Sequence, residues 1–218
     1  MKKMIKAFFI TGTDTNVGKT YIACALLKHF SSIGLKSVGM KPVSAGIESH
    51  STEYRNEDVI KLSSAGNVNA SLEWVNPYSF PQPVAPNLAA GLSGVAISCD
   101  KIIEAYDCLS ELADVVIVEG AGGVLVPLND RETIADLAIK MDLPMILVVG
   151  IRLGCINHAL LSVEAIQSRG LKLAGWVANQ IDPAMEMYEE NVLCLKERIS
   201  APCISEVKLG QVPVFKNL

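Results

Sequence analysis

The fold of this chain is decided by the stretch Gly12-Thr13-Asp14-Thr15-Asn16-Val17-Gly18-Lys19-Thr20. It follows an apolar run at residues 4–10 and precedes another at residues 21–27. A strand, a glycine-containing loop, Gly-Lys-Thr and then an apolar helix predict a loop that binds phosphate groups. Loop N–H groups and the helix N-terminus supply the many donors that phosphate oxygens need. A plain strand-to-helix turn would explain the glycines, but it would not explain Lys19 and Thr20 at the start of the helix.

The loop departs in one place from the usual pattern G-x-x-x-x-G-K-[ST]. Thr13 stands where that pattern has its first glycine, and the glycine comes one residue earlier, at Gly12. Lys19 is placed to reach the β- and γ-phosphates of a nucleotide, and the Thr20 hydroxyl is placed to bind Mg²⁺. The loop is therefore a variant, and such variants mark subfamilies.

Length and composition indicate one α/β domain over residues 1–218, long enough for a sizeable core. The formal net charge of −4 gives no reason to expect nucleic acid or an anionic membrane as a partner. No apolar run approaches the roughly 20 residues of a membrane span, and the one after Met1-Lys2-Lys3 is too short for a signal peptide. Six cysteines without a C-x-x-C pair indicate free thiols. We therefore expect a cytoplasmic protein that binds neither nucleic acid nor a membrane.

Apolar strand-like runs alternate with helix-like runs along the chain. Strands are expected at residues 4–10, 37–41, 115–118, 145–149, 173–178 and 203–204, and helices at 18–33, 56–65, 98–112, 133–141, 157–169 and 185–199. Residues 42–46 read as a loop, and residues 74–94 as an irregular excursion with a helical piece near Leu88. This alternation predicts a three-layer fold with a mostly parallel central sheet and helices on both faces.

Polar and glycine-rich segments collect where the predicted strands end. They are Lys41, Glu119 with the following glycines, residues 150–157 and Asn179. Ligands of open parallel sheets bind at the carboxyl ends of the strands. The sequence therefore predicts one site at that edge of the sheet.

Acidic residues at this edge are candidate Mg²⁺ ligands beside Thr20. Glu119 closes a buried strand, where an acid without a partner is unfavourable, so a ligand role is favoured. Asp58 is a second candidate, although as an acid in the first turn of a helix it could simply interact with the helix dipole. On spacing alone the second interpretation of Asp58 is the better one.

Lys41 ends a strand that we expect to lie beside the first strand, which would aim its ammonium at the γ-phosphate. A solvated lysine at a strand end is an equal alternative. Gly120-Ala121-Gly122-Gly123 allows a ligand to approach the backbone closely, or simply forms a tight turn. The helix start at residues 153–158 offers free N–H groups to a carboxylate. Cys155 there has no motif-linked base, so we expect it to be inert.

Five motifs occur in a fixed order. They are Thr11-Gly12-Thr13-Asp14-Thr15-Asn16-Val17-Gly18-Lys19-Thr20, Lys41-Pro42-Val43, Val118-Glu119-Gly120-Ala121-Gly122-Gly123, Leu153-Gly154-Cys155-Ile156-Asn157-His158 and Gly175-Trp176-Val177-Ala178-Asn179. Each is shared with other proteins of the P-loop NTPase superfamily, but the ordered set resembles the dethiobiotin synthetase family from the first strand to about residue 204.

The resemblance implies an ATP-dependent ligase of biotin biosynthesis with 7,8-diaminononanoate (7,8-diaminopelargonate), CO₂ or bicarbonate, and ATP with Mg²⁺ as substrates. One amine forms a carbamate, the γ-phosphoryl group passes to it, and the second amine closes the ureido ring. The products are dethiobiotin, ADP and phosphate. A homodimer with the active site at the subunit interface is also implied.

The resemblance also assigns roles to residues. It implies that Lys41, Lys19 and Thr15 are catalytic and that Thr20, Asp58 and Glu119 bind Mg²⁺, which reverses the interpretation of Asp58. The implied nucleotide-binding residues are Asn16, Val17, Gly18, Lys19, Thr20, Tyr21, Asp58, Glu119, Gly120, Ala121, Gly122, Asn179 and Gln180. The implied substrate-binding residues are Ser44, Gly122, Gly154, Cys155, Ile156 and Asn157.

The chain departs from the family in two places. The family often has Lys-Pro-Val-Ala-Ser-Gly, whereas here the order is Ser44-Ala45, so either Ser44 takes over the substrate contact or the contact is lost. The family also continues beyond its last strand with Gly-x-(Ile/Leu)-Pro and a further helix around the base, where Ser205–Val207 and Lys208 stand here. We therefore expect a shortened base-binding region, with weaker ATP affinity or relaxed choice between ATP and GTP.

Three other functions compete with this one. An amide synthase of the same superfamily would need an ammonia source, usually a glutaminase domain, for which the chain has no room. An ATPase switch of the partitioning type would carry a further lysine in the loop, where Thr13, Asp14 and Thr15 stand. A pure nucleotide-binding module would show no turnover stimulated by the diamine.

Overall fold

The structure is a computed structural model that describes residues 6–46 and 56–216. A six-stranded sheet has the order β2-β5-β1-β6-β7-β8, and every neighbouring pair in it is parallel. Its strands are β1 (Lys6–Gly12), β2 (Ser37–Met40), β5 (Val115–Gly123), β6 (Met145–Ile151), β7 (Leu173–Gln180) and β8 (Cys203–Val207). The predicted parallel sheet is confirmed.

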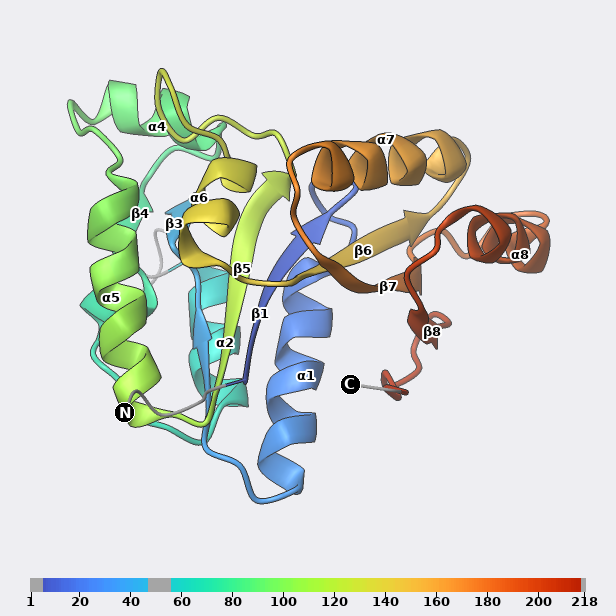
Figure 1. The fold of residues 1–218 in the computed structure, drawn as a ribbon, viewed down its shortest axis with the longest axis horizontal. Helices are drawn as coiled ribbons and strands as arrows, with labels where there is room; N and C mark the ends of the chain where they lie inside the picture. Colours follow the sequence, from blue (N-terminus) through green and yellow to red (C-terminus); the bar gives the residue numbers. More distant parts are fainter. Residues whose placement is uncertain (1–5, 47–55, 217–218) are drawn as a thin grey trace.

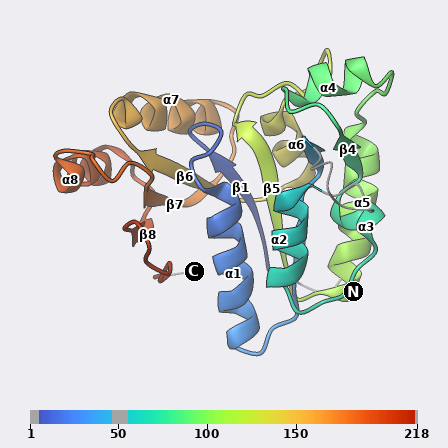
Figure 2. The same cartoon turned by 180° about the vertical axis from the view of Figure 1, so that it is seen from behind.

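Helices cover both faces of this sheet (Figures 1 and 2). On one face lie α1 (Lys19–Ser32) and α2 (Glu57–Ala65), and on the other α5 (Cys99–Leu112), α6 (Ile134–Met141), α7 (Cys155–Ser168) and α8 (Tyr188–Arg198). Phe8 and Ile10 pack towards α1, whereas Phe9 between them packs towards α5 and α6. Successive side chains of a strand point to opposite faces, so a strand covered on both sides must be apolar throughout.

The strand order corrects one expectation about β2. It pairs with β5 and not with β1, because β5 lies between them. Lys41, directly after β2, is therefore a neighbour of Glu119 in the middle of β5. The alternation of strands and helices predicted the strands themselves, but it carries no information about their order across the sheet.

The segment between α2 and α5 is more regular than expected. It contains α3 (Leu72–Val75), β4 (Tyr78–Phe80) and α4 (Pro86–Leu92), which is the helical piece expected near Leu88. β3 (Val43–Ala45) pairs with β4 in a separate two-stranded parallel sheet, so the prediction of a loop at residues 42–46 was wrong there. This small sheet continues the line of β2 beyond Lys41.

Most element boundaries lie within three residues of those expected. Ser98 caps α5 by accepting from the N–H of Lys101, and Thr133 caps α6 in a capping box with Asp136. The strands run further towards the site than predicted, β1 to Gly12 and β5 to Gly123, while residues 4 and 5 lie outside the described part. Among the described residues, the structure contains no helix that is both long enough and apolar enough to span a membrane.

Candidate active site

One cavity of about 710 Å³ lies at the carboxyl ends of β1, β2 and β5. It is lined by Thr15, Asn16, Gly18, Lys19, Thr20, Tyr21, Lys41, Val43, Ala45, Asn56, Glu57, Asp58, Lys61, Pro83, Val84, Ala85, Pro86, Glu119, Ala121, Gly122 and Val126. A volume of this size is in the range of small-molecule sites. The three predicted catalytic residues and the three predicted Mg²⁺ ligands all line it.

The loop after β1 folds over the side chain of Lys19. The ammonium of Lys19 donates to the backbone carbonyl of Asp14 at 2.8 Å, and the residue is only 7% exposed. Asn16 and Gly18 both have positive φ, 60° and 93°, which bends the loop into a ring before α1 begins. The N-terminus of α1 therefore opens directly into the cavity.

Burial lowers the pKa of Lys19, and the nearby Lys41 ammonium lowers it further, to about 8, although Glu119 and Asp58 act in the opposite direction. The positive charge of the Lys19 ammonium is thus not fully balanced by the carboxylates near it. Anionic phosphate groups would supply that charge, which is what a phosphate-binding lysine requires.

A compact cluster of charges lies beside this loop. The ammonium of Lys41 donates to Glu119 Oε1 at 2.6 Å and to Asp58 Oδ2 at 3.1 Å. The hydroxyl of Thr20 lies 2.8 Å from Asp58 Oδ1 and 2.8 Å from Glu119 Oε1. Thr20 of α1, Asp58 of α2, Lys41 after β2 and Glu119 within β5 thus meet.

The charges of this cluster support one another. Burial alone would lower the pKa of Lys41, but the carboxylates of Glu119 and Asp58 outweigh it and raise that pKa above the usual value. Burial raises the pKa of Asp58, yet Lys41 and the Thr20 hydroxyl together lower it below the usual value. Lys41 and Asp58 are therefore charged at neutral pH.

The oxygen atoms of the cluster suit a magnesium ion. Glu119 is 1% exposed, and its Oε2 has no hydrogen-bond partner among residues 6–46 and 56–216. The single proton of the Thr20 hydroxyl can serve only one of the two carboxylates at a time. An unpaired buried carboxylate oxygen beside a second carboxylate and a hydroxyl is the donor set that Mg²⁺ prefers.

Comparison with known proteins identifies the family. The AAA domain family matches residues 6–216. An ATP-dependent dethiobiotin synthetase BioD of Aromatoleum aromaticum is 52% identical over 202 residues, covering 93% of this chain and 90% of the relative. The chain belongs to the dethiobiotin synthetase family. A second protein of that name, from Nitrosospira multiformis, is 49% identical over 98% of this chain and 91% of its own length.

Solved structures of lower identity agree on the fold of this dethiobiotin synthetase family member. The MinC:MinD cell division complex of Aquifex aeolicus matches with a TM-score of 0.54 at 17% identity, covering 92% of this chain and 80% of that one. A ParA family ATPase of Chlorobium tepidum matches with a TM-score of 0.57 at 11% identity, covering 95% and 86%. These likenesses are to the P-loop fold alone.

Ser44, expected from the family pattern to contact substrate, does not line the cavity. Its neighbours Val43 and Ala45 on β3 do, while the Ser44 hydroxyl donates to Asn76 Oδ1 at 2.9 Å and lies 3.2 Å from the Ser79 hydroxyl. Side chains alternate along a strand, so the exchanged Ser-Ala order turns the serine away from the cavity.

The helix start at residues 154–157 lies outside the cavity lining of this single chain. Gly154 and Asn157 are exposed, Ile156 is half-buried, and Cys155 is buried with its thiol 3.8 Å from Asn191 Oδ1. Burial raises the pKa of the Cys155 thiol, which disfavours the reactive thiolate.

The remaining predicted residues surround the loop rather than one common point. Asn179 is buried and donates to the carbonyl of Val17 at 2.8 Å, and Gln180 accepts from the N–H of Leu209. Gly120 lies beneath the cluster, with its carbonyl 3.5 Å from the Lys41 ammonium. These positions sit beside the cavity and not in its lining.

Two contacts were missed by the sequence analysis. The hydroxyl of Tyr21 donates to the carbonyl of Gln211 at 2.6 Å, so the segment after β8 reaches the start of α1. Asp14 forms an ion pair with Arg152 at 2.5 Å, which links the phosphate loop to the residues before α7. Neither pair could have been found from sequence spacing, because 190 and 138 positions separate the partners.

Proposed function

We propose that this chain is an ATP-dependent dethiobiotin synthetase that acts on 7,8-diaminononanoate, CO₂ or bicarbonate, and ATP with Mg²⁺. The observation that carries the proposal is the meeting of Lys19, Lys41, Thr20, Asp58 and Glu119 around one cavity. A carbamate and a triphosphate are both anionic, so a reaction between them needs cations at the point of contact. Lys19 and Lys41 supply them.

The proposed roles follow from where each group lies. Lys19 and the backbone of Asn16 to Thr20 hold the β- and γ-phosphates, and Thr15 holds a phosphoryl oxygen. Lys41 stabilises the negative charge that is shared between the carbamate oxygen and the γ-phosphoryl group during transfer. The second amine then attacks the activated carbonyl and expels phosphate, so catalysis here consists of positioning and charge stabilisation.

Thr20, Asp58 and Glu119 are the residues we propose for Mg²⁺, because their oxygens lie together and Glu119 Oε2 has no hydrogen-bond partner in the described part of the chain. When bound, the ion neutralises phosphate charge. Ala121 and Gly122 line the cavity next to the loop, and we assign them to the nucleotide and the substrate.

We further propose a homodimer in which Gly154, Cys155, Ile156 and Asn157 hold the substrate carboxylate for the opposite subunit. Gly154 and Asn157 are exposed at the N-terminus of α7, which supports this, because the free N–H groups of a helix start bind anions. Leu153 next to them is 93% exposed, so its side chain is available to a partner subunit.

The nucleotide base is proposed to lie near Tyr21, Asn179 and Gln180, where the turn at residues 208–211 approaches α1. The single domain would then close over the base with the segment that follows β8. ATP and bicarbonate are both supplied in the cytoplasm, which is the compartment we propose for the enzyme.

The test uses ¹³C-labelled bicarbonate with ATP, Mg²⁺, 7,8-diaminononanoate and the purified protein. Mass spectrometry is expected to detect dethiobiotin with one labelled carbon, which is the ureido carbon. Formation of ADP without a labelled ring would contradict the proposal and would favour an ATPase switch. The control reaction omits the diamine. No ring can then form, so no labelled dethiobiotin should be detected.

A further inference from the structure

The backbone of Lys41 is held at an otherwise open edge of the main sheet. β2 is the outermost strand, and Ser37 and Lys41 turn their backbone groups away from β5. The N–H of Lys41 donates to the carbonyl of Val75 at 2.7 Å, and Asn67 occupies the corresponding place at Ser37. The position of the Lys41 ammonium therefore depends on segments outside the sheet.

Residue 77 breaks the ladder at Lys41. In a parallel pair, a strand residue that donates to one partner residue accepts from the residue two positions further along the partner. After the bond from Lys41 to Val75, the donor to the Lys41 carbonyl would be the N–H of residue 77. That residue is Pro77, which has no N–H.

The side chain of Asn76 replaces the missing donor. Its amide nitrogen donates to the carbonyl of Lys41 at 2.6 Å and to the carbonyl of Tyr78 at 3.0 Å. Its amide oxygen accepts from the hydroxyl of Ser44 at 2.9 Å. Both hydrogens and the oxygen of the amide are thus used, which fixes the side chain in one orientation.

We propose that Asn76 is a positioning residue for the Lys41 ammonium, acting as a side-chain substitute for the N–H that Pro77 lacks. The expected effect of Asn76 on catalysis rests on the proposed function. Asn76 does not line the cavity, so it acts through the Lys41 backbone and not through contact with substrate.

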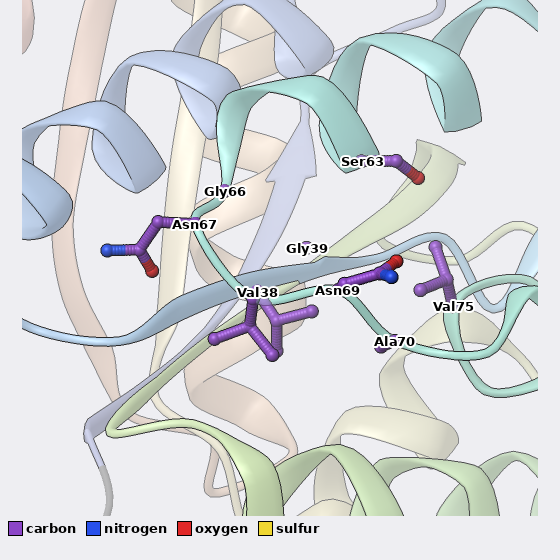
Figure 3. A pocket seen from close by; sticks show the side chains of 9 residues that line it. Val38, Gly39, Ser63, Gly66, Asn67, Asn69, Ala70 and Val75 are labelled. Carbon is purple, nitrogen blue, oxygen red and sulfur yellow. The ribbon is translucent and has the colours of Figure 1, made fainter.

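Asn67 provides a matched control at the other end of the same strand. It donates to the carbonyl of Leu35 at 2.9 Å and accepts from the N–H of Ser37 at 2.8 Å. Figure 3 shows the 290 Å³ cavity along this edge, with Asn67 towards one end, Val75 towards the other, and Val38 and Gly39 between them. Both asparagines hold β2, but only Asn76 holds the residue that carries the ammonium.

Asn76→Ala and Asn76→Asp both remove the donor to Lys41. We expect kcat for diamine-dependent phosphate release to fall about tenfold to a hundredfold, because small misplacements of a catalytic group cost that much. The KM for ATP should change less than about twofold, since the phosphate loop is untouched. Asn67→Ala should lower the melting temperature without lowering kcat. Equal kcat in the parent and both Asn76 variants would overturn the proposal.

A second change tests the donor role directly. Pro77→Ala in the Asn76→Ala background supplies a backbone N–H opposite the Lys41 carbonyl. The double variant should be faster than Asn76→Ala alone. A double variant no faster than Asn76→Ala would contradict the donor role.

A readout independent of the reaction separates this inference from the proposed function. Lys41 is 5% exposed and ion-paired, so competitive acetylation followed by mass spectrometry should label it slowly. Asn76→Ala should raise the labelling rate of Lys41, whereas Asn67→Ala should not. A parent protein without diamine-dependent turnover would contradict the proposed function. An unchanged labelling rate of Lys41 in Asn76→Ala would overturn the inference, whatever the turnover.

Discussion

The burial of Lys19 has a testable consequence. Its pKa, lowered first by burial and then by Lys41 to about 8, leaves the free loop partly neutral just above that pH. Bound phosphate groups favour the ammonium, so ATP binding should take up protons at a pH of about 8.5 and not at a pH of about 6.5, where Lys19 is already charged. Calorimetry in buffers with different ionisation enthalpies measures this uptake. Equal proton uptake at both pH values would show that the proton is not bound by Lys19.

The residues of the site were predictable to different degrees. Lys19 and Thr20 follow from the loop pattern alone, and Glu119 follows from its place directly after the apolar run 115–118, although β5 continues to Gly123. Asp58 needed the family resemblance, because an acid in the first turn of a helix has an ordinary structural explanation. Asn76 could not be found at all, since its role depends on a strand order and on a missing N–H that become visible only in three dimensions.

At the scale of elements, the join between β1 and α1 leaves no room for a side chain at Gly18. Its φ is +93°, and a Cβ there would lie 2.2 Å from the amide nitrogen of Asn179. Gly34, just beyond the other end of α1, has a similar φ of +86° with nothing within 4 Å.

The two glycines therefore separate backbone strain from contact. Gly34→Ala should cost about 1–2 kcal/mol of stability, the usual penalty of a left-handed residue, and leave kinetics unchanged. Gly18→Ala should add the clash with Asn179, displace the loop and raise the KM for ATP at least about tenfold. Chemical denaturation and steady-state kinetics measure the two effects. An unaltered KM in Gly18→Ala would argue against the close fit of the loop on β7.

Element boundaries were predicted well where the chain has caps and glycines, as at Ser98, Thr133 and Gly170. β3 and β4 were missed because three-residue strands beside prolines have no periodicity to detect. The predicted position of β2 beside β1 was wrong for a different reason. Strand order is set by how the faces pack, and central strands such as β1 and β6 are apolar on both faces.

At the scale of the whole molecule, the proposed dimer makes the start of α7 an interface. Leu153→Asp should convert the dimer to a monomer and abolish diamine-dependent turnover, because a charge cannot be buried there without a partner. Leu193→Asp on α8, where the leucine is 57% exposed, is the matched control and should leave both properties intact. Sedimentation velocity gives the mass. A Leu153→Asp protein that stays dimeric and active would place the interface elsewhere.

The most direct test of the account concerns the Lys41 ammonium between Glu119 and Asp58. The measurement is diamine-dependent phosphate release by Lys41→Gln, with Lys61→Gln as the control, since Lys61 is an exposed lysine of the same cavity. The account predicts that Lys41→Gln binds ATP but releases phosphate at least about a hundredfold more slowly, because the variant loses a charge that stabilises the transition state. Lys61→Gln should stay near the parent rate. A Lys41→Gln protein that turns over like the parent would contradict it.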